Sequence, residues 1–188
     1  MEMTISAVIL AGGKARRMGG RDKGLQLWQG KPLIQQVIER VQPQISTMAI
    51  NANRNISDYA KLGLPVFADE LPDFQGPLSG MLTALEQAKT DFVLFTPCDS
   101  PFFPHNLLEK LKNTIENDRT LLAYACDETR SHPTFCLMSV QLKAKLRQYL
   151  ASGERRLLQF MRENGGKSVI FNSTEGQFVN FNTLDDLQ

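Results

Sequence analysis

Apolar and polar residues alternate along this chain in blocks that predict strands and helices in turn. The apolar runs within 5–10 and 91–96 are nearly continuous, which is typical of strands buried inside a sheet. Between residues 31 and 41 the apolar positions instead recur at helical spacing, and Pro32 stands where a first helical turn accepts proline. Strands that alternate with helices in this way indicate an α/β protein with a parallel sheet.

The same patterns predict the remaining elements. Shorter apolar runs predict strands at 47–51, 65–68, 121–126, 132–138, 169–171 and 178–181. Helical spacing predicts helices at 31–41, 57–62, 78–88, 104–117, 140–150 and 154–163. We therefore expect a three-layer α/β fold around a mainly parallel sheet, with the Rossmann-like, doubly wound topology of nucleotide-binding proteins.

The composition restricts the class of protein. With 188 residues, 42% hydrophobic and 22% charged, the chain fits one medium-sized globular domain. Its formal net charge of +1 creates no overall field that would attract nucleic acid or an anionic membrane, and no apolar run is long enough to span a bilayer. We expect a cytoplasmic protein whose three cysteines are small buried side chains rather than disulfide partners.

A basic loop follows the first predicted strand and carries the strongest functional signal. The adjacent glycines Gly12 and Gly13 let the backbone turn sharply and approach a ligand closely. The cationic side chains that follow are Lys14, Arg16, Arg17, Arg21 and Lys23. Turn amides and this many cations suit several phosphate charges, so the loop predicts binding of a nucleoside triphosphate.

Two common phosphate-binding motifs are absent from the sequence. The nearest approach to the P-loop pattern G-x-x-x-x-G-K-[ST] runs from Gly24 to Lys31, but it has five intervening residues and then Pro32 in place of the hydroxyl residue. The dinucleotide pattern G-x-G-x-x-G is missing because Gly12 and Gly13 are adjacent. The loop therefore predicts neither a Walker ATPase nor an ordinary Rossmann dehydrogenase.

Polar residues stand directly after the predicted parallel strands, where ligands bind in such sheets. Asp99 follows a buried strand between Pro97 and Pro101, and a carboxylate held there suits Mg²⁺ that is shared with phosphate oxygens. Asn51 and Asp69 end the two neighbouring strands. Their side-chain oxygens can accept from the donors on the Watson–Crick edge of guanine, so either residue could select the base.

Several separate strings resemble the molybdenum cofactor guanylyltransferases, a family of nucleotidyltransferases. The string from Leu10 to Lys23 is similar to the signature loop of that family. The other matching strings are N-A-N-R at 51–54, G-P-L-x-G-M at 76–81, C-D-x-P at 98–101, G-E-R-R at 153–156 and F-V-N-x-N-T at 178–183. The likeness extends from residue 8 to about residue 187, although Glu128 replaces a family glycine and Leu184 replaces a usual proline.

The resemblance implies transfer of GMP from GTP to molybdopterin, with Mg²⁺ as cofactor and pyrophosphate as second product. It implies catalytic roles for Lys23, Arg17 and Asp99, and it assigns the metal to Asp99. The nucleotide would contact Leu10, Ala11, Gly12, Gly13, Lys23, Asn51, Asp69, Gly80 and Asp99. The acceptor would contact Arg155, Asn180 and Asn182. A nucleotide-binding part at about 1–103 and an acceptor-binding part at about 104–188 would together form the single domain 1–188.

Three alternative functions share some of these features. A cytidylyltransferase that acts on the same pterin shares the loop. A sugar-phosphate nucleotidyltransferase does so too, although the short chain and the C-terminal strings disfavour it. A non-catalytic GTP-binding adaptor that passes cofactor to apoenzymes is the alternative from another class. The sequence leaves open whether the acceptor already carries molybdenum, and partners could include other cofactor-biosynthesis proteins and molybdoenzyme apoproteins.

Overall fold

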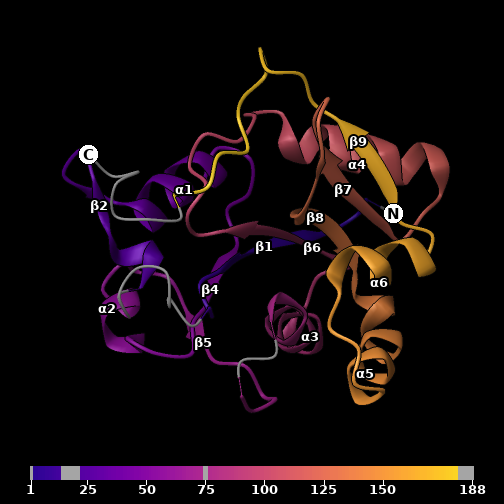
Figure 1. The fold of residues 1–188 in the computed structure, drawn as a ribbon, viewed down its shortest axis with the longest axis horizontal. Helices are drawn as coiled ribbons and strands as arrows, with labels where there is room; N and C mark the ends of the chain where they lie inside the picture. The colour runs from indigo at the N-terminus through magenta and orange to yellow at the C-terminus, as the bar shows by residue number, and fades with distance from the viewer. Residues whose placement is uncertain (1, 14–21, 74–75, 182–188) are drawn as a thin grey trace.

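A central sheet with helices on both faces forms the protein (Figure 1). The computed structural model describes residues 2–13, 22–73 and 76–181. Its α-helices are α1 (Leu33–Val41), α2 (Ile56–Ala60), α3 (Pro77–Gln87), α4 (Leu107–Asp118), α5 (Lys143–Ala151) and α6 (Leu157–Glu163). Helices α1 and α4 cover one face of the sheet and α3, α5 and α6 cover the other, so the three-layer α/β prediction is confirmed.

The central sheet is mainly parallel, as predicted. Its strands are β1 (Ile5–Leu10), β4 (Met48–Asn51), β5 (Val66–Phe67), β6 (Phe92–Pro97), β7 (Leu122–Cys126), β8 (Ser131–Ser139) and β9 (Lys167–Ile170). Their order across the sheet is β5-β4-β1-β6-β8-β7-β9. Strand β8 is antiparallel to both of its neighbours, whereas the other pairs of neighbouring strands are parallel.

The central strand β6 is buried on both faces, as its apolar run predicts. Its residues Val93, Leu94 and Phe95 are each fully buried. Val93 and Phe95 pack in the hydrophobic cluster of α3, α5 and α6, whereas Leu94 packs in the cluster of α1 and α4. Because successive side chains of a strand point to opposite faces, this short run holds both helical layers against the sheet.

The strand order creates a crevice at the carboxyl ends of β1 and β6. The chain passes from β1 to β4 and β5 on one side, then returns to β6 on the other side of β1. Helix α1 covers the outward crossover and α3 covers the return, on opposite faces of the sheet (Figure 1). The reversal of direction between β1 and β6 is the switch point at which doubly wound proteins bind their ligands.

The predicted strand at 178–181 is wrong, because this segment pairs with no strand of the described chain. Its backbone instead crosses the loop after β6, where the amide of Phe181 donates to the carbonyl oxygen of Asp99 at 3.0 Å. Phe178 and Phe181 are both buried although they stand three residues apart. The segment therefore lacks the two-residue alternation of a strand.

Other elements differ from the prediction at their starts. Strand β3 (Lys31–Pro32) pairs with β2 (Leu27–Trp28) in a small hairpin, so α1 begins only after it. The predicted helix at 140–150 is divided, because a 3-10 turn, η3 (Val140–Leu142), precedes α5. Helices α4 and α6 also begin later than predicted. The central turns of the predicted helices are confirmed, and only the helix boundaries differ from the prediction.

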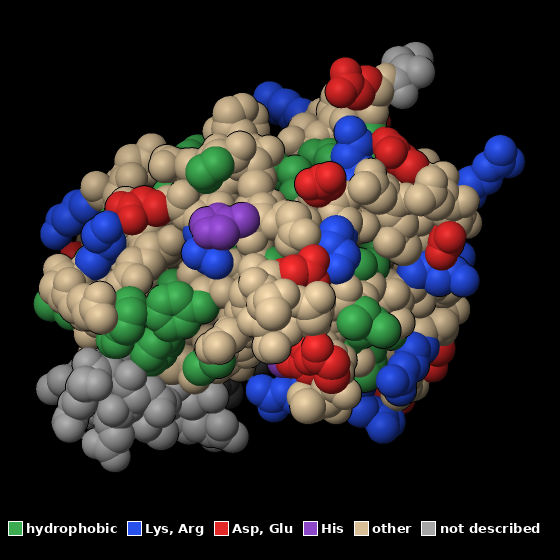
Figure 2. Space-filling view, turned by 90° about the horizontal axis from the view of Figure 1, so that it is seen from above, with side chains coloured by type: hydrophobic (Ala, Val, Ile, Leu, Met, Phe, Trp, Pro, Cys, Tyr) green, Lys and Arg blue, Asp and Glu red, His purple; other side chains and the backbone are tan. Residues whose placement is uncertain are grey.

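The surface carries both signs of charge. Acidic and basic side chains are interspersed over the face seen in Figure 2, in keeping with the formal net charge of +1. Cys98, Cys126 and Cys136 are buried and free, as expected. The described part of the chain contains no helix that combines the length and the apolar character needed to span a bilayer.

Candidate active site

Backbone hydrogen bonds carry the predicted site residues to one edge of the sheet. The amide of Ala11 donates to Asn51 O at 2.7 Å, and the amide of Cys98 donates to Leu10 O at 3.1 Å. The sheet ladder therefore continues one residue beyond β1 and β6. As a result, the glycines after β1 and Asp99 after β6 leave the sheet side by side.

A hydrogen-bonded pair links the ends of β4 and β5. The Asn51 amide nitrogen Nδ2 donates to Asp69 Oδ1 at 2.8 Å. Asn51 is only 2% exposed, whereas Asp69 is half-buried. Within the described part of the chain, Asn51 is the one side chain that donates to the Asp69 carboxylate. The pair thus orients a partly accessible carboxylate by means of a buried amide.

Two glycines enclose the Asn51 side chain. A Cβ at Gly80, on α3, would overlap Asn51 Oδ1 and would lie 2.8 Å from Asn51 Cγ. A Cβ at Gly12 would lie 3.0 Å from the same Oδ1. Real Cβ atoms essentially never approach as closely as the one at Gly80 would, whereas the contact at Gly12 is tight enough that Asn51 would have to shift by a few tenths of an ångström. At Gly13, by contrast, a Cβ would meet open space.

Asp99 and Lys23 form an ion pair at the other side of the crevice. The Lys23 ammonium nitrogen Nζ lies 3.5 Å from Asp99 Oδ2, and Asp99 is 7% exposed. Burial raises the pKa of the Asp99 carboxyl, and the nearby Lys23 charge offsets part of that rise. A buried carboxylate with a raised pKa favours an approaching cation, because a second positive charge stabilises its ionised form.

The 3-10 turn η2 (Lys23–Leu25) positions Lys23. A Cβ at Gly24 would lie 3.1 Å from the Tyr59 hydroxyl and 3.3 Å from Cys98 Sγ, so the turn packs directly against the residue before Asp99. The preceding carboxylate, Asp22, is buried and forms an ion pair with Arg54 from the loop after β4. Both contacts fix the backbone from which Lys23 extends.

The donor set around Asp99 fits Mg²⁺. This ion binds proteins through one or two carboxylates and takes its other oxygens from water and substrate phosphates. Asp99 supplies one such carboxylate at the strand end. Among the described residues, no group of three or more histidine, cysteine, aspartate or glutamate side chains could hold a metal alone. The geometry therefore fits a metal that would be shared with a phosphate ligand.

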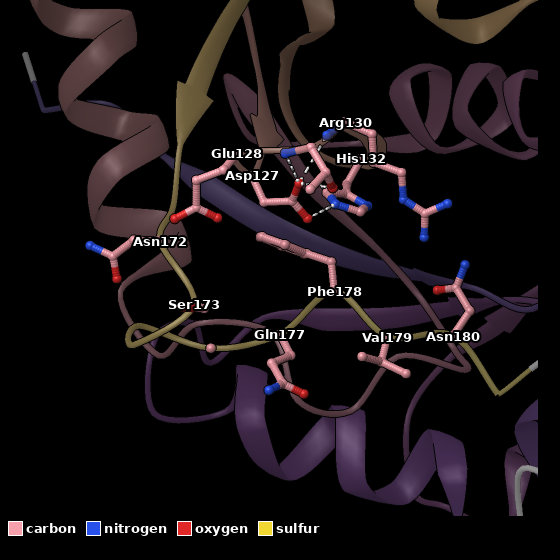
Figure 3. Close-up of a pocket in the computed structure, with 12 residues that line it drawn as sticks. Asp127, Glu128, Arg130, His132, Asn172, Ser173, Gln177, Phe178, Val179 and Asn180 are labelled. Atoms are coloured by element: carbon pink, nitrogen blue, oxygen red, sulfur yellow. Dashed lines mark hydrogen bonds and ion pairs between the residues drawn. The ribbon is translucent and has the colours of Figure 1, made fainter.

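A second feature, a pocket of about 450 Å³, lies beside the C-terminal segment (Figure 3). One wall is the turn between β7 and β8, residues 127–130, and the opposite wall is the segment 176–180. His132 lies over the ring of Phe178, with centroids 4.6 Å apart, and its Nε2 is 2.6 Å from Asp127 Oδ2. Hydrogen bonds from His132 and the turn hold the pKa of Asp127 below its usual range. The pocket is thus a preformed polar site with an aromatic floor.

The pocket wall is bonded to the loop that carries Asp99. The amide of Gln177 donates to Phe102 O at 2.8 Å, and the amide of Phe181 donates to Asp99 O at 3.0 Å. The Ser100 hydroxyl also donates to Asn180 Oδ1. Residues 176–180 therefore line the pocket, while residues 177, 180 and 181 of the same segment hold the Asp99 loop.

The structure brings together most of the predicted nucleotide residues. Leu10, Ala11, Gly12, Asn51, Asp69 and Gly80 share one network of backbone and side-chain contacts, while Lys23 pairs with Asp99. Asn180 lines the pocket. Arg155 does not: its guanidinium donates to the carbonyl oxygens of Leu150 and Glu154, in the turn between α5 and α6. The predicted residues Arg17 and Asn182, and the cations at 14, 16 and 21, lie outside the described residues.

The sequence analysis did not single out Asn53 or Ser100. Asn53 Nδ2 donates to Gly12 O at 3.1 Å, and Asn53 Oδ1 accepts from the amide of Asp69 at 2.8 Å. The signal for Asn53 was its place two residues after Asn51, because alternate residues of an extended chain point the same way. Ser100 is fully buried, and no sequence pattern marks its contact with a segment 80 residues away.

Comparison with known proteins shows that this chain is a nucleotidyltransferase. Residues 7–167 match the family described as the MobA-like NTP transferase domain. The chain is 73% identical over its full length to the molybdenum cofactor guanylyltransferase of Haemophilus influenzae, of which it covers 98%, and 57% identical to that of Pasteurella multocida, of which it covers 100%. This chain belongs to the molybdenum cofactor guanylyltransferase family, and its activity is a guanylyl transfer.

A solved structure from Archaeoglobus fulgidus has the same fold. That protein, a molybdopterin-guanine dinucleotide biosynthesis protein A, superposes with a TM-score of 0.75 at 21% identity. The match covers 97% of this chain and 94% of the other. The fold is therefore retained at an identity far below that of the Haemophilus influenzae relative.

Proposed function

We propose that this protein transfers GMP from GTP to the terminal phosphate of molybdopterin and releases pyrophosphate. The observation that carries the proposal is the shared loop after β6. Its Asp99 side chain faces Lys23, and its backbone is bonded to the wall of the polar pocket. A nucleotide at the strand edge and an acceptor in the pocket would therefore meet at Asp99. Cofactor-biosynthesis proteins and molybdoenzyme apoproteins are the proposed partners before and after the reaction.

The nucleotide would lie along the carboxyl ends of β1, β4 and β5. Backbone amides at Gly12 and Gly13 would bind phosphate oxygens, with help from Lys23 and Arg17. Asp69 is the better candidate for reading the base, because its carboxylate is partly accessible while Asn51 is buried and donates to it. A carboxylate accepts from both the N1–H and the 2-amino group of guanine, and adenine offers no such pair.

The chemical step needs alignment and charge neutralisation. The acceptor phosphate would attack the α-phosphorus, and the leaving pyrophosphate would take the electron pair of the broken bond. Lys23 would stabilise negative charge on the phosphates from its position beside Asp99. Mg²⁺ bound to Asp99 would supply further neutralisation of phosphate charge. The protein would hold the two phosphates in line and exclude competing water.

The pocket at 127–130 and 176–180 would hold the acceptor. Its volume suits a small fused heterocycle, and its lining offers amides, an arginine and an aromatic ring. Asn180 and Asn182 are the proposed ligands from the C-terminal segment. Arg155 would bind the acceptor only from the turn between α5 and α6, away from the pocket lining. Its guanidinium there donates to the carbonyl oxygens of Leu150 and Glu154.

Replacing Asp69 with asparagine should reduce selectivity for guanine. The change keeps the size of the side chain but removes the charge that accepts from guanine. Loss of a hydrogen bond to a charged group costs about 1.5–3 kcal/mol, so kcat/KM for GTP should fall by about 10- to 100-fold, while the rate with saturating GTP changes less. Steady-state pyrophosphate release over a range of GTP concentrations measures this, and an unchanged KM would remove Asp69 from base recognition.

Replacing Arg130 with alanine should weaken acceptor binding. Arg130 is exposed and lines the pocket, so its loss removes a cation without disturbing the core. The KM for molybdopterin should rise by about tenfold, as expected for one charged hydrogen bond, while the KM for GTP stays constant. Arg162→Ala, an exposed arginine on α6, is the matched control. Equal acceptor KM values in the two variants would place the acceptor elsewhere.

A further inference from the structure

We infer that Asn53 is a positioning residue that makes the enzyme selective for guanine without touching the base. The inference rests on the proposed function, in which Asp69 reads the base. Asn53 would hold the loop after β1 and the backbone of Asp69 at a fixed distance from each other. The loop after β1 would bind the phosphates, and the Asp69 carboxylate would bind the base at the other end of the nucleotide. The distance between them therefore decides whether both ends can be bound at the same time.

The Asn53 side chain bridges two segments that are far apart in sequence. Its Nδ2 donates to the carbonyl oxygen of Gly12 at 3.1 Å, and its Oδ1 accepts from the amide of Asp69 at 2.8 Å. Both partners lie just beyond the ends of strands, Gly12 after β1 and Asp69 after β5. One side chain thus connects the two outer parts of the proposed nucleotide site across the end of β4.

The chemistry of the bridge requires an amide. It needs one donor and one acceptor on the same short side chain, which asparagine supplies and aspartate does not. A carboxylate at position 53 would still accept from the Asp69 amide, but it would place negative charge against the carbonyl oxygen of Gly12. It would also stand close to the Asp69 backbone from which the second carboxylate extends.

Asn51 and Asn53 hold different parts of the same residue. Asn51 binds the Asp69 carboxylate and sets its direction, whereas Asn53 binds the Asp69 amide and sets its position. The packing around Gly12 depends on both, because a Cβ there would lie 2.9 Å from Asn53 Nδ2 and 3.0 Å from Asn51 Oδ1. Loss of the Asn53 bridge should therefore let Asp69 and the loop move apart while the buried Asn51 contact persists.

The test compares GTP with ITP, which lacks the 2-amino group of guanine. In the unchanged enzyme, Asp69 should favour GTP over ITP by about tenfold or more in kcat/KM, the value of one hydrogen bond to a charged group. Asn53→Ala should lower kcat/KM for GTP by about tenfold and bring the GTP-to-ITP ratio close to one. If Asn53 had a merely structural role, Asn53→Ala would lower kcat/KM equally for GTP and ITP, and the GTP-to-ITP ratio would stay unchanged.

A matched control and a second variant complete the test. Asn164→Ala also removes a hydrogen bond from an asparagine amide to a backbone carbonyl, that of Phe160, but at the end of α6. It should leave the ratio unchanged. Asn53→Asp keeps the size of the side chain but replaces the donor to Gly12 O with a negative charge, so it should lower the ratio even if the alanine variant folds poorly.

Asp69→Asn separates this inference from the proposed function. If Asp69→Asn abolishes the GTP-to-ITP preference and the two Asn53 variants do so too, the positioning role is supported. If Asp69→Asn abolishes the preference but both folded Asn53 variants keep it, the role of Asn53 is overturned and base reading by Asp69 stands. If Asp69→Asn keeps the full preference, base reading by Asp69 fails, and the assignment of Asn53 fails with it.

Discussion

Replacement of Asp99 with asparagine is expected to lower turnover by about 10³-fold while the protein remains folded. The change removes the buried charge that would hold Mg²⁺ and that faces Lys23 at 3.5 Å. It keeps the side-chain volume, so the backbone bond between Phe181 and Asp99 should persist. Single-turnover and steady-state pyrophosphate release measure the loss, with Asp118→Asn, at an exposed position on α4, as the matched control.

The same variant should not lose stability at neutral pH. Burial raises the folded-state pKa of Asp99 above its ordinary value near 3.8, so the ionised form opposes folding. This unfavourable contribution is absent below the unfolded-state pKa, develops as the pH rises towards the folded-state pKa, and is fully present above it. Asp99→Asn should therefore unfold at an equal or higher temperature than the unchanged protein at pH 7, and its advantage should shrink towards pH 3.

Either result can contradict this account of Asp99. Turnover within a few-fold of the unchanged enzyme would mean that the reaction needs neither a metal bound to the Asp99 carboxylate nor the negative charge of that carboxylate. A large loss of thermal stability at pH 7 would mean that the ion pair with Lys23 outweighs burial. Thermal unfolding at pH 4 and pH 7, followed by circular dichroism, distinguishes that case from a purely catalytic loss.

Replacement of Gly80 with alanine is expected to reduce kcat/KM for GTP by about 100-fold, comparable to the loss of two hydrogen bonds. The new Cβ would overlap Asn51 Oδ1 and lie 2.8 Å from Asn51 Cγ. Asn51 must then move, and its bond to Asp69 moves with it. Overpacking costs about 1–3 kcal/mol, while alanine in a helix regains about 1 kcal/mol over glycine, so the fold should survive.

Ser79→Ala provides the control for this helix. Ser79 precedes Gly80 on α3, is fully buried, and its hydroxyl has no hydrogen-bond partner among the described residues. Its replacement should leave the KM for GTP unchanged and should not lower stability. A Gly80→Ala enzyme with an ordinary KM for GTP would show that the Asn51–Asp69 pair tolerates displacement and does not set base affinity.

The residues at the edge of the sheet could be predicted from the sequence, because the end of each buried strand is visible in the local sequence pattern. A buried strand is visible as a continuous apolar run, and parallel strands must end at a common edge. The positions of Asn51, Asp69 and Asp99 after three such runs therefore predict that all three lie at this common edge. Their mutual contacts, such as the bond from Asn51 to Asp69, follow from the register of β4 and β5.

The pocket and its wall could not be predicted in the same way. Residues 178–181 contain apolar positions that indicate a strand, but Phe181 donates to the carbonyl oxygen of Asp99 and Asn180 accepts from the Ser100 hydroxyl, in an irregular loop about 80 residues earlier. No periodic pattern encodes such a contact. The string around Arg155 also gives no indication that its guanidinium donates to the carbonyl oxygens of Leu150, in α5, and of Glu154, although that contact is local. Long-range contacts between loops are thus the part that needed the structure.

Pyrophosphate release with Mg²⁺, measured in parallel with GTP, CTP and ATP and with or without molybdopterin, tests the central claim most directly. Guanylyl transfer to the pterin predicts release with GTP alone, only when molybdopterin is present, and with one guanine dinucleotide formed per pyrophosphate. Equal release with CTP would contradict the role of Asp69 in choosing the base. Tight binding of GTP without release under any condition would contradict the enzyme mechanism and favour a cofactor-delivering adaptor.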